Sequence, residues 1–335
     1  MKLLSDQQRL YLIESEQLYR AWREVVWRQQ EYKYGMRWKS VNGRDYLIRF
    51  SNARGDGRSL GAKSIETEKI YEQFNEGKKL ANEKYLGLSE KIKMQTRINK
   101  ALRLGRMPTV IGDILLVLDK FHALDDFRVV GTHALFAYEA MAAAEFKIEL
   151  LASGDVDLLY DNRRSISVVA KKIDGQGLLG LLKKVDKTFE IKDFERFRAV
   201  NKDGFMVDMI TQDRGMNYAK PKPLVDKDFE FVEVPNLEWL INSPRVDQVV
   251  ICANGQPVMM PVPDPRAFAV HKVWLSKQNE REPVKKSRDF NQAAMVFYLL
   301  KEHLPNYPVD ADQMRYFPKD VIDKSLAALN LHLSQ

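Results

Sequence analysis

The sequence predicts an α+β protein in which helices pack on a sheet, with a mainly helical region before the sheet and further helices after it. Two observations predict this class. Apolar residues recur at helical spacing near both ends of the chain, and short apolar runs bounded by turn residues, typical of buried strands, fill the middle. We therefore expect a mainly helical, basic domain over 1–107, a core that contains the sheet over 108–262, and a helical region over 263–335.

Composition places the chain among globular proteins. Its 335 residues suffice for two or three domains, and its 45% hydrophobic and 30% charged residues are ordinary proportions. The single cysteine, Cys252, excludes an internal disulfide framework and fits a reducing compartment, so we expect a cytoplasmic protein. The start, MKLLSDQQ, has no signal-peptide core, and no run of about 18 apolar residues occurs. We therefore expect no membrane segment.

The N-terminal region is basic and predicted to be helical. Helical spacing of apolar residues runs over about 5–32 and 64–104, and an Asn-Gly turn predicts a hairpin over 36–49 between them. Residues 1–105 hold 22 Lys and Arg against 13 Asp and Glu, a net +9, so the remainder carries −2 of the total of +7. This imbalance suggests a polyanionic partner for the N-terminal region, and a solvated helix surface is the alternative.

Two glycine patterns are weaker signals. Residues 51–63 are glycine-rich and cationic and are expected to form a loop that offers N–H groups to phosphates; an ordinary surface loop is the alternative, because the Walker pattern is absent. The GxGxxG match at 175–180 follows a polar segment, and we interpret it as a turn into a short helix. Further strands are expected over 166–170, 196–201, 205–210, 237–241, 246–253 and 257–262, and further helices over about 110–125, 266–278, 283–303 and in the tail after 310.

The strongest chemical signal is a group of aspartates on predicted strands. An apolar strand, Phe127–Val130, leads through Gly131–Thr132 into an alanine-rich helix, and the chain then reaches Asp155 and Asp157. Residues i and i+2 of a strand share a face, so these carboxylates repel each other unless a cation, usually Mg²⁺, lies between them. Asp208 lies in a later apolar strand, where a lone charge needs a partner or a metal. We expect it to be the third ligand of a phosphoryl- or nucleotidyl-transfer site; pairing with Arg or Lys is the alternative.

These residues resemble the nucleotidyltransferase superfamily that includes DNA polymerase beta. Its pattern is Gly-Ser/Thr at a helix start, Asp-x-Asp on the next strand and a later third carboxylate, matched here by Gly131–Thr132, Asp155, Asp157 and Asp208. The 22 residues between Thr132 and Asp155 exceed the usual gap, which a loop or a longer helix would explain. The chain looks most like a bacterial family of this fold without a settled substrate, in the segments MRWKSVNGRDYLIRF, RSLGAKSIETE, VVGTHALFAYEA, SGDVDLLYD, AVNKDGFMVDMI, PDPRAFAVHKVWLS and EPVKKSRDFNQA.

The resemblance implies a nucleotidyltransferase core, which is a mixed sheet with helices packed on it. It also implies transfer of a nucleoside monophosphate from an NTP to an acceptor hydroxyl. It implies that Asp155, Asp157 and Asp208 are catalytic and hold two Mg²⁺ ions, with Mn²⁺ as a substitute. The implied nucleotide-binding residues lie at the helix start and on the later helices, where basic residues resemble those of abortive-infection-type nucleotidyltransferase toxins: Gly131, Thr132, His133, Lys272, Lys285 and Arg288. For the histidine, packing or solvent exposure is the alternative role, and for the lysines it is solvation.

The acceptor is left open by the sequence. An RNA 3′ end, a protein hydroxyl and a small molecule all suit the same core, and the basic N-terminal region could recruit an RNA or protein acceptor. Two other classes of function compete with an active enzyme. One is an inactive nucleotidyltransferase fold that binds nucleotides or nucleic acid, which Mg²⁺-dependent binding without transfer would indicate. The other is a regulatory protein in which the basic region binds nucleic acid, which steeply salt-dependent binding would indicate.

Overall fold

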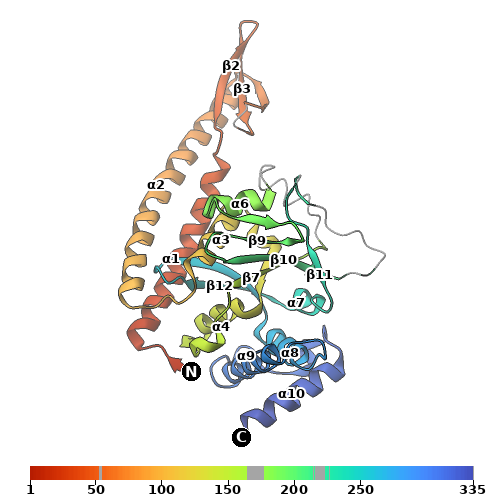
Figure 1. The fold of residues 1–335 in the computed structure, drawn as a ribbon. Coiled ribbons are helices and arrows are strands. Elements are labelled where there is room, and N and C mark those ends of the chain that lie inside the picture. Colours follow the sequence, from red (N-terminus) through yellow and green to blue (C-terminus); the bar gives the residue numbers. More distant parts are fainter. Residues whose placement is uncertain (53–54, 164–176, 214, 216–222, 226, 335) are drawn as a thin grey trace. The chain divides into compact units, whose positions relative to one another are not determined.

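The computed structural model describes residues 1–52, 55–163, 177–213, 215, 223–225 and 227–334, and it confirms the predicted α+β class (Figure 1). The chain forms two compact units. One comprises Met1–Leu12 with Asn99–Gln335, and the other Ile13–Ile98. The domain boundaries predicted at 107 and 262 stay predictions. The strand predicted at 166–170 and the first two residues of the GxGxxG match lie outside the described residues.

The smaller unit contains most of two long helices and a three-stranded sheet. The helices α1, Asp6–Glu31, and α2, Ile65–Ala101, confirm the predicted helices, and a bond from Trp22 Nε1 to Ser89 Oγ at 3.0 Å joins them. The sheet comprises β2, Met36–Val41, β3, Arg44–Phe50, and β4, Gly57–Ala62, and its first two strands are the predicted hairpin.

The loop predicted at 51–63 is wrong for residues 57–62, which form β4. Glycine at position 57 permits this pairing, because a Cβ atom there would lie 2.8 Å from Ile48 Cγ2. Ser64 begins α2 as predicted. Its hydroxyl accepts from the Thr67 amide at 3.3 Å, and Thr67 Oγ1 accepts from the Ser64 amide at 2.8 Å. This reciprocal pair satisfies two backbone donors at the helix start.

The larger unit is built on a mixed sheet with the order β5-β7-β10-β9-β8, and β11 also pairs with β10. Strand β10 runs parallel to β7, whereas β5 and β9 run antiparallel to their neighbours. Val129, Val156 and Met209 are fully buried and belong to the core of this sheet. Its strands are β5 Phe127–Val130, β7 Asp155–Tyr160, β8 Glu190–Lys192, β9 Glu195–Val200, β10 Met206–Gln212 and β11 Val232–Val234.

Helices and a second hairpin pack around this sheet, largely at the predicted positions. Four further short strands lie outside the prediction: β1 of the chain start pairs antiparallel with β6, and β8 and β11 belong to the mixed sheet. No helix among the residues that the structure describes is long and apolar enough to cross a membrane. The elements are β1 Lys2–Leu3, α3 Thr109–Lys120, α4 Leu135–Ala142, β6 Ala144–Glu145, α6 Gly177–Val185, β12 Arg245–Ile251 and β13 Pro257–Pro263.

The C-terminal helices share a core with the sheet. These are α8, Pro265–Ser276, α9, Pro283–Glu302, and α10, Lys319–Leu333. One apolar cluster joins sheet residues to residues of these helices and of the segments beside them: Val130, Leu159, Ile210, Leu237, Trp239, Leu240, Ile241, Ala267, Val270, Met314, Phe317 and Ile322. The first nine residues of α8 are all buried, so this helix is fixed on the sheet and can hold a functional side chain in place.

The strand predicted at 237–241 is wrong: Glu238–Asn242 form the short helix α7. Arg128 of β5 explains the helix, because its guanidinium donates to the carbonyl oxygens of Leu240, Ile241 and Ser243 at 2.6–2.9 Å. Carbonyl groups at the end of a helix have no partner within the helix, and here a buried cation supplies one. A short apolar run is compatible with either a strand or a helix, and here the contact with Arg128, which is distant in sequence, favours the helix.

Candidate active site

Strand register brings the three predicted aspartates together. Asp208 of β10 lies directly beside Asp157 of β7, and Val130 of β5 lies on the other side of Asp157. Each of Asp155, Asp157 and Asp208 offers a carboxylate oxygen within 4.8 Å of those of the other two. The long segment before β7 does not disturb this alignment, because it is taken up by β6 and a turn at Ile148–Leu150.

Gly131 allows the chain to turn against these carboxylates. Its φ is +67°, a left-handed conformation that glycine adopts without steric cost. A Cβ atom at this position would lie only 2.3 Å from Asp157 Oδ2. The residues after Gly131 continue as a 3₁₀ turn, Gly131–Ala134, into α4. The predicted helix start is therefore a tighter turn, and it lies in contact with the aspartate cluster.

The aspartate cluster is electrostatically unfavourable without a cation. Desolvation raises the pKa of Asp157 to about 7, and the charges of Asp155 and Asp208 act in the same direction. Lys272 and Arg198 oppose this shift. A carboxyl group whose charged form is disfavoured to this extent gains from a bound cation, and hard oxygen donors are the ligands that Mg²⁺ prefers. The donor set therefore fits a divalent cation.

Asp208 also has a cationic partner, Arg198 of β9, directly opposite it in the antiparallel register. Arg198 Nε donates to Asp208 Oδ1 at 2.7 Å and Nη2 to Oδ2 at 2.6 Å. The pairing weighed as an alternative role for this aspartate thus occurs within the cluster. Because a carboxylate has about four lone-pair sites, two bonds to Arg198 leave sites for a metal ion.

A buried ion-pair network adjoins the cluster. Lys272 of α8 donates to Asp289 Oδ1 at 2.6 Å, and Arg281 donates to Asp289 Oδ2 at 2.8 Å. Asp289 is fully buried and Lys272 nearly so. Burial lowers the pKa of Lys272, and the Asp289 charge opposes this shift. One buried carboxylate thus holds two cations on the side of the site where Asp157 lies.

The hydroxyl of Thr132 has a defined orientation. Gln292 of α9 donates from Nε2 to Thr132 Oγ1 at 3.2 Å and to the carbonyl oxygen of Leu150 at 2.8 Å. Because Thr132 Oγ1 accepts this bond, its own proton remains for another acceptor. Gln292 is fully buried and was not predicted, since nothing in a helical Asn-Gln-Ala-Ala sequence distinguishes it from a core residue.

A cavity of about 890 Å³ opens beside the cluster. Of the predicted site residues, Gly131, Asp157, Asp208 and Lys272 line it. The rest of its wall is mostly apolar and aromatic, with a few amide and charged groups: Val130, Phe197, Ile210, Val232, Val234, Pro235, Asn236, Leu237, Leu240, Phe268, His271, Trp274, Leu275, Gln278, Asn279, Glu280 and Arg281. An apolar cavity with carboxylates and cations at one place suits a ligand that has a flat apolar part and an anionic part.

Residues 109–316, more than half of the chain, match the protein family described as Nucleotidyltransferase. The chain belongs to this family. Neither the search of curated proteins nor the search of solved structures finds a match. Members of a nucleotidyltransferase family move a nucleoside monophosphate, which makes the chain a transferase with a nucleotide substrate.

Four residues predicted to bind the nucleotide do not line the large cavity of this nucleotidyltransferase: Thr132, His133, Lys285 and Arg288. His133 is buried between Phe136 and Phe205, with ring centroids at 6.0 and 6.5 Å, and burial lowers its pKa to about 4. Lys285 is half-exposed and pairs with Glu282 at 2.8 Å. Arg288 donates to the carbonyl oxygen of Ala152 at 3.2 Å. Their nucleotide-binding roles stay predictions.

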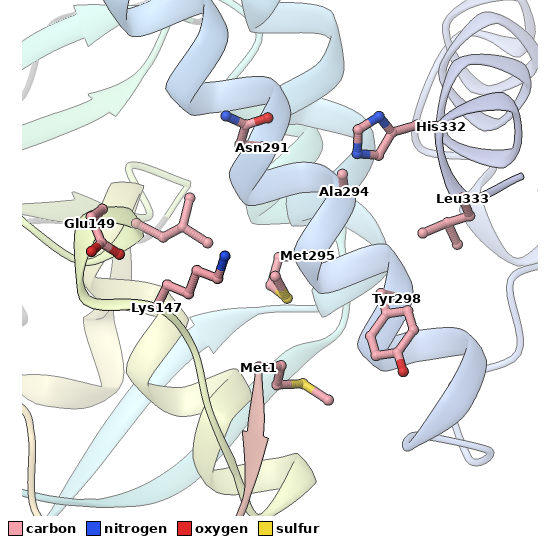
Figure 2. Close-up of a pocket in the computed structure, with 10 residues that line it drawn as sticks. Met1, Lys147, Glu149, Asn291, Ala294, Met295, Tyr298, His332 and Leu333 are labelled. Carbon is pink, nitrogen blue, oxygen red and sulfur yellow. The ribbon is translucent and has the colours of Figure 1, made fainter. Parts of the chain in front are cut away.

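A second cavity of the nucleotidyltransferase, of about 710 Å³, contains none of the three aspartates. Asn291, Met295 and Tyr298 of α9 line it, together with Lys147 and with His332 of α10 (Figure 2). Of the two cavities, only the one beside Asp157 and Asp208 contains residues of the aspartate cluster.

Proposed function

We propose that the chain is a Mg²⁺-dependent nucleotidyltransferase that transfers a nucleoside monophosphate from an NTP to the hydroxyl group of a macromolecular acceptor, with Mn²⁺ as a substitute ion. One observation carries the proposal. The register of β5, β7 and β10 gathers three carboxylates beside a glycine turn, at the edge of a cavity large enough for a nucleotide. The cytoplasm is the proposed compartment, supported by one free, buried cysteine.

The aspartates provide the cation site. Asp155, Asp157 and Asp208 would hold the ions, and bound Mg²⁺ would supply positive charge to the phosphate oxygens and lower the pKa of the acceptor hydroxyl. Arg198 fixes the Asp208 carboxylate from β9, so this ligand is oriented before any ion arrives. The absence of a Gly131 side chain leaves Asp157 Oδ2 accessible at the turn.

The turn and α8 would bind the triphosphate. Backbone N–H groups from Gly131 onward can donate to phosphate oxygens. The Thr132 hydroxyl can also donate its proton to them, because its oxygen accepts the hydrogen bond from Gln292. Lys272 and Arg281 line the same cavity and would stabilise the negative charge of the leaving pyrophosphate. In the reaction the acceptor oxygen bonds to the α-phosphorus, the bond from that phosphorus to the bridging oxygen breaks, and pyrophosphate leaves with the electron pair. The hydroxyl proton passes to solvent.

The aromatic part of the cavity would hold the base. Trp274 stands edge-on to Trp239 with ring centroids at 5.2 Å, and His271 lies 5.7 Å from Trp274. Burial, with Lys272 nearby, lowers the pKa of His271 to about 3, so this ring is uncharged at pH 7. A flat base can pack on such a wall.

The test is transfer of label from each α-labelled NTP, with Mg²⁺ and a cell extract. We expect one class of macromolecule to become labelled, and Asp155→Ala with Asp157→Ala to abolish the label without unfolding the chain. The matched control is Glu190→Ala with Asp193→Ala, which removes the same charge from exposed positions of the same unit. Undiminished transfer by the folded aspartate variant would reject the metal site. Mg²⁺-dependent NTP binding without transfer to any acceptor would favour a binding module.

A further inference from the structure

The excess positive charge of the smaller unit is confined to its sheet region. Residues 33–63 hold 8 Lys and Arg against 2 Asp and Glu, a net +6. The helical parts of this unit, 13–32 and 64–98, together hold 10 basic and 10 acidic residues and are neutral. A solvated helix surface, the alternative weighed for the basic N-terminal region, therefore does not account for the charge.

One face of this sheet packs on the helices. Leu47 of β3 is fully buried, and its cross-strand neighbour Trp38 contacts Tyr71 of α2, with ring centroids at 5.9 Å. Arg49 belongs to the same face and has a structural role. Its guanidinium donates to the carbonyl oxygens of Glu31, Lys33, Gly35 and Phe50 and so ties the end of α1 to the sheet.

The opposite face, which we call the outer face, carries cations and aromatic rings. Cross-strand partners lie on the same face of a sheet. The pairs Arg37 with Ile48, Lys39 with Tyr46 and Val41 with Arg44 therefore place their side chains here. Arg37, Lys39 and Arg44 are exposed, and Tyr46 and Phe50 are half-exposed. Arg37 lies over the Phe50 ring at 4.4 Å from its centroid.

Negative charge is absent from the outer face, as far as its residues are described. Asp45 lies on the packed face, where it accepts a hydrogen bond from Ser40, and Asp56 accepts from Asn52 at 2.8 Å. Arg37, Lys39 and Arg44 make no ion pair with any carboxylate that the structure describes. Their charges are therefore available to a partner.

We propose that the outer face binds single-stranded RNA, and that the end of this RNA is the acceptor; the second part rests on the proposed function. Arg37 and Lys39 are two residues apart on one strand, a spacing of about 6.6 Å that is similar to the step between phosphates in an extended strand. Tyr46 and Phe50 offer rings on which unpaired bases can stack.

Two features favour single-stranded RNA over the other polyanions. Stacking on a sheet face requires bases that are free of a duplex, whereas duplexes are bound mainly through grooves and phosphates. The hydroxyl groups of Tyr46 and Ser59 belong to the outer face, because Ser59 is the cross-strand neighbour of Ile48. Hydroxyl groups can bond to the 2′-hydroxyl that RNA has and DNA lacks.

The test is binding of a short, unstructured, fluorescein-labelled pyrimidine RNA to the full chain, followed by anisotropy. Three neutralised phosphates predict a slope of log affinity against log salt of about −2. We expect the triple variant Arg37→Glu, Lys39→Glu, Arg44→Glu to weaken binding at least about tenfold and to flatten this slope. Tyr46→Ala should weaken binding roughly fivefold or more at every salt concentration.

The matched control is Lys69→Glu, Lys78→Glu, Lys79→Glu, which makes the same charge change at exposed positions of α2. It should bind RNA nearly as the native chain does. Equal losses in both triple variants would overturn the proposal, as would tighter binding of duplex RNA or single-stranded DNA, or a labelled protein as the acceptor in extract. If the charge-reversed triple variant of the outer face does not fold, the test is repeated with glutamine instead of glutamate at the same three positions.

Failure of this inference and of the proposed function can be told apart. Asp155→Ala with Asp157→Ala should abolish transfer and leave RNA affinity unchanged. The outer-face variant should keep Mg²⁺-dependent binding of NTP, measured by calorimetry, and lose transfer to RNA. Undetectable RNA binding by a chain that still transfers label to another acceptor would reject the outer face alone. RNA binding by a chain that binds no NTP would reject the nucleotidyl-transfer site alone.

Discussion

Gly131→Ala tests whether the turn and the aspartate cluster form one site. The new Cβ atom would lie 2.3 Å from Asp157 Oδ2, about 1 Å inside an ordinary contact distance. The backbone φ of +67° adds strain of about 1–2 kcal/mol for any residue with a side chain. We expect the variant to lose about this much free energy of unfolding, and its Asp157 carboxylate to move by about 1 Å.

A catalytic group displaced by about 1 Å can cost on the order of 100-fold in rate. Gly131→Ala should therefore transfer label about 100-fold more slowly while remaining folded, as measured by initial rates and by urea unfolding. Gly154→Ala is the matched control. Gly154 directly precedes Asp155, but a Cβ atom at position 154 would have no neighbouring atom within 4 Å. An unchanged rate in Gly131→Ala, or an equal loss in Gly154→Ala, would refute the steric argument.

Two further predictions concern charge. The pKa of Asp157 is about 7 in the folded chain, against an ordinary value of 3.8, so the free energy of unfolding falls as pH rises between these values. Without metal at pH 8, Asp157→Asn should therefore stabilise the chain by at most about 4 kcal/mol, measured by urea unfolding. The gain should shrink at pH 5, and an equal gain at both pH values contradicts this reasoning. Asp289→Asn leaves the buried Lys272 and the partly buried Arg281 without a counter-charge and should cost about 3 kcal/mol or more of the free energy of unfolding. Lys272→Met should cost less, since Asp289 keeps Arg281; the reverse order of urea midpoints counts against the network.

Elements with a strong local pattern could be predicted from the sequence. Helical spacing placed α1, α2, α8 and α9, and the Asn-Gly turn placed the β2–β3 hairpin. Residues 237–241 were mistaken for a strand because the bonds from Arg128 that cap α7 come from a residue about a hundred positions earlier. The edge strand β4 was missed because a glycine-rich sequence carries no apolar alternation to mark it.

The candidate site divides in the same way. The pairing of Asp155 with Asp157 can be predicted from the local sequence, because residues two positions apart on a strand lie on the same face. The parallel register that places Asp208 beside Asp157 is a property of the folded sheet, so the sequence supports it only through a resemblance. The buried partner of Lys272 was equally hidden. Asp289 lies among basic residues on the next helix, and only the packing of α9 against α8 singles it out.

The connectivity of the two units has an evolutionary consequence. The larger unit takes its first strand and about two turns of helix from residues 1–12 and continues at residue 99. Within this unit Gln8 donates to the carbonyl oxygen of Leu102 at 3.1 Å. Residues 13–98 are therefore an insert whose two ends leave and rejoin one fold. Recombination that exchanged this segment of the gene would leave the nucleotide chemistry in place. If the outer face selects the RNA, such an exchange is a route by which related enzymes acquire different acceptors.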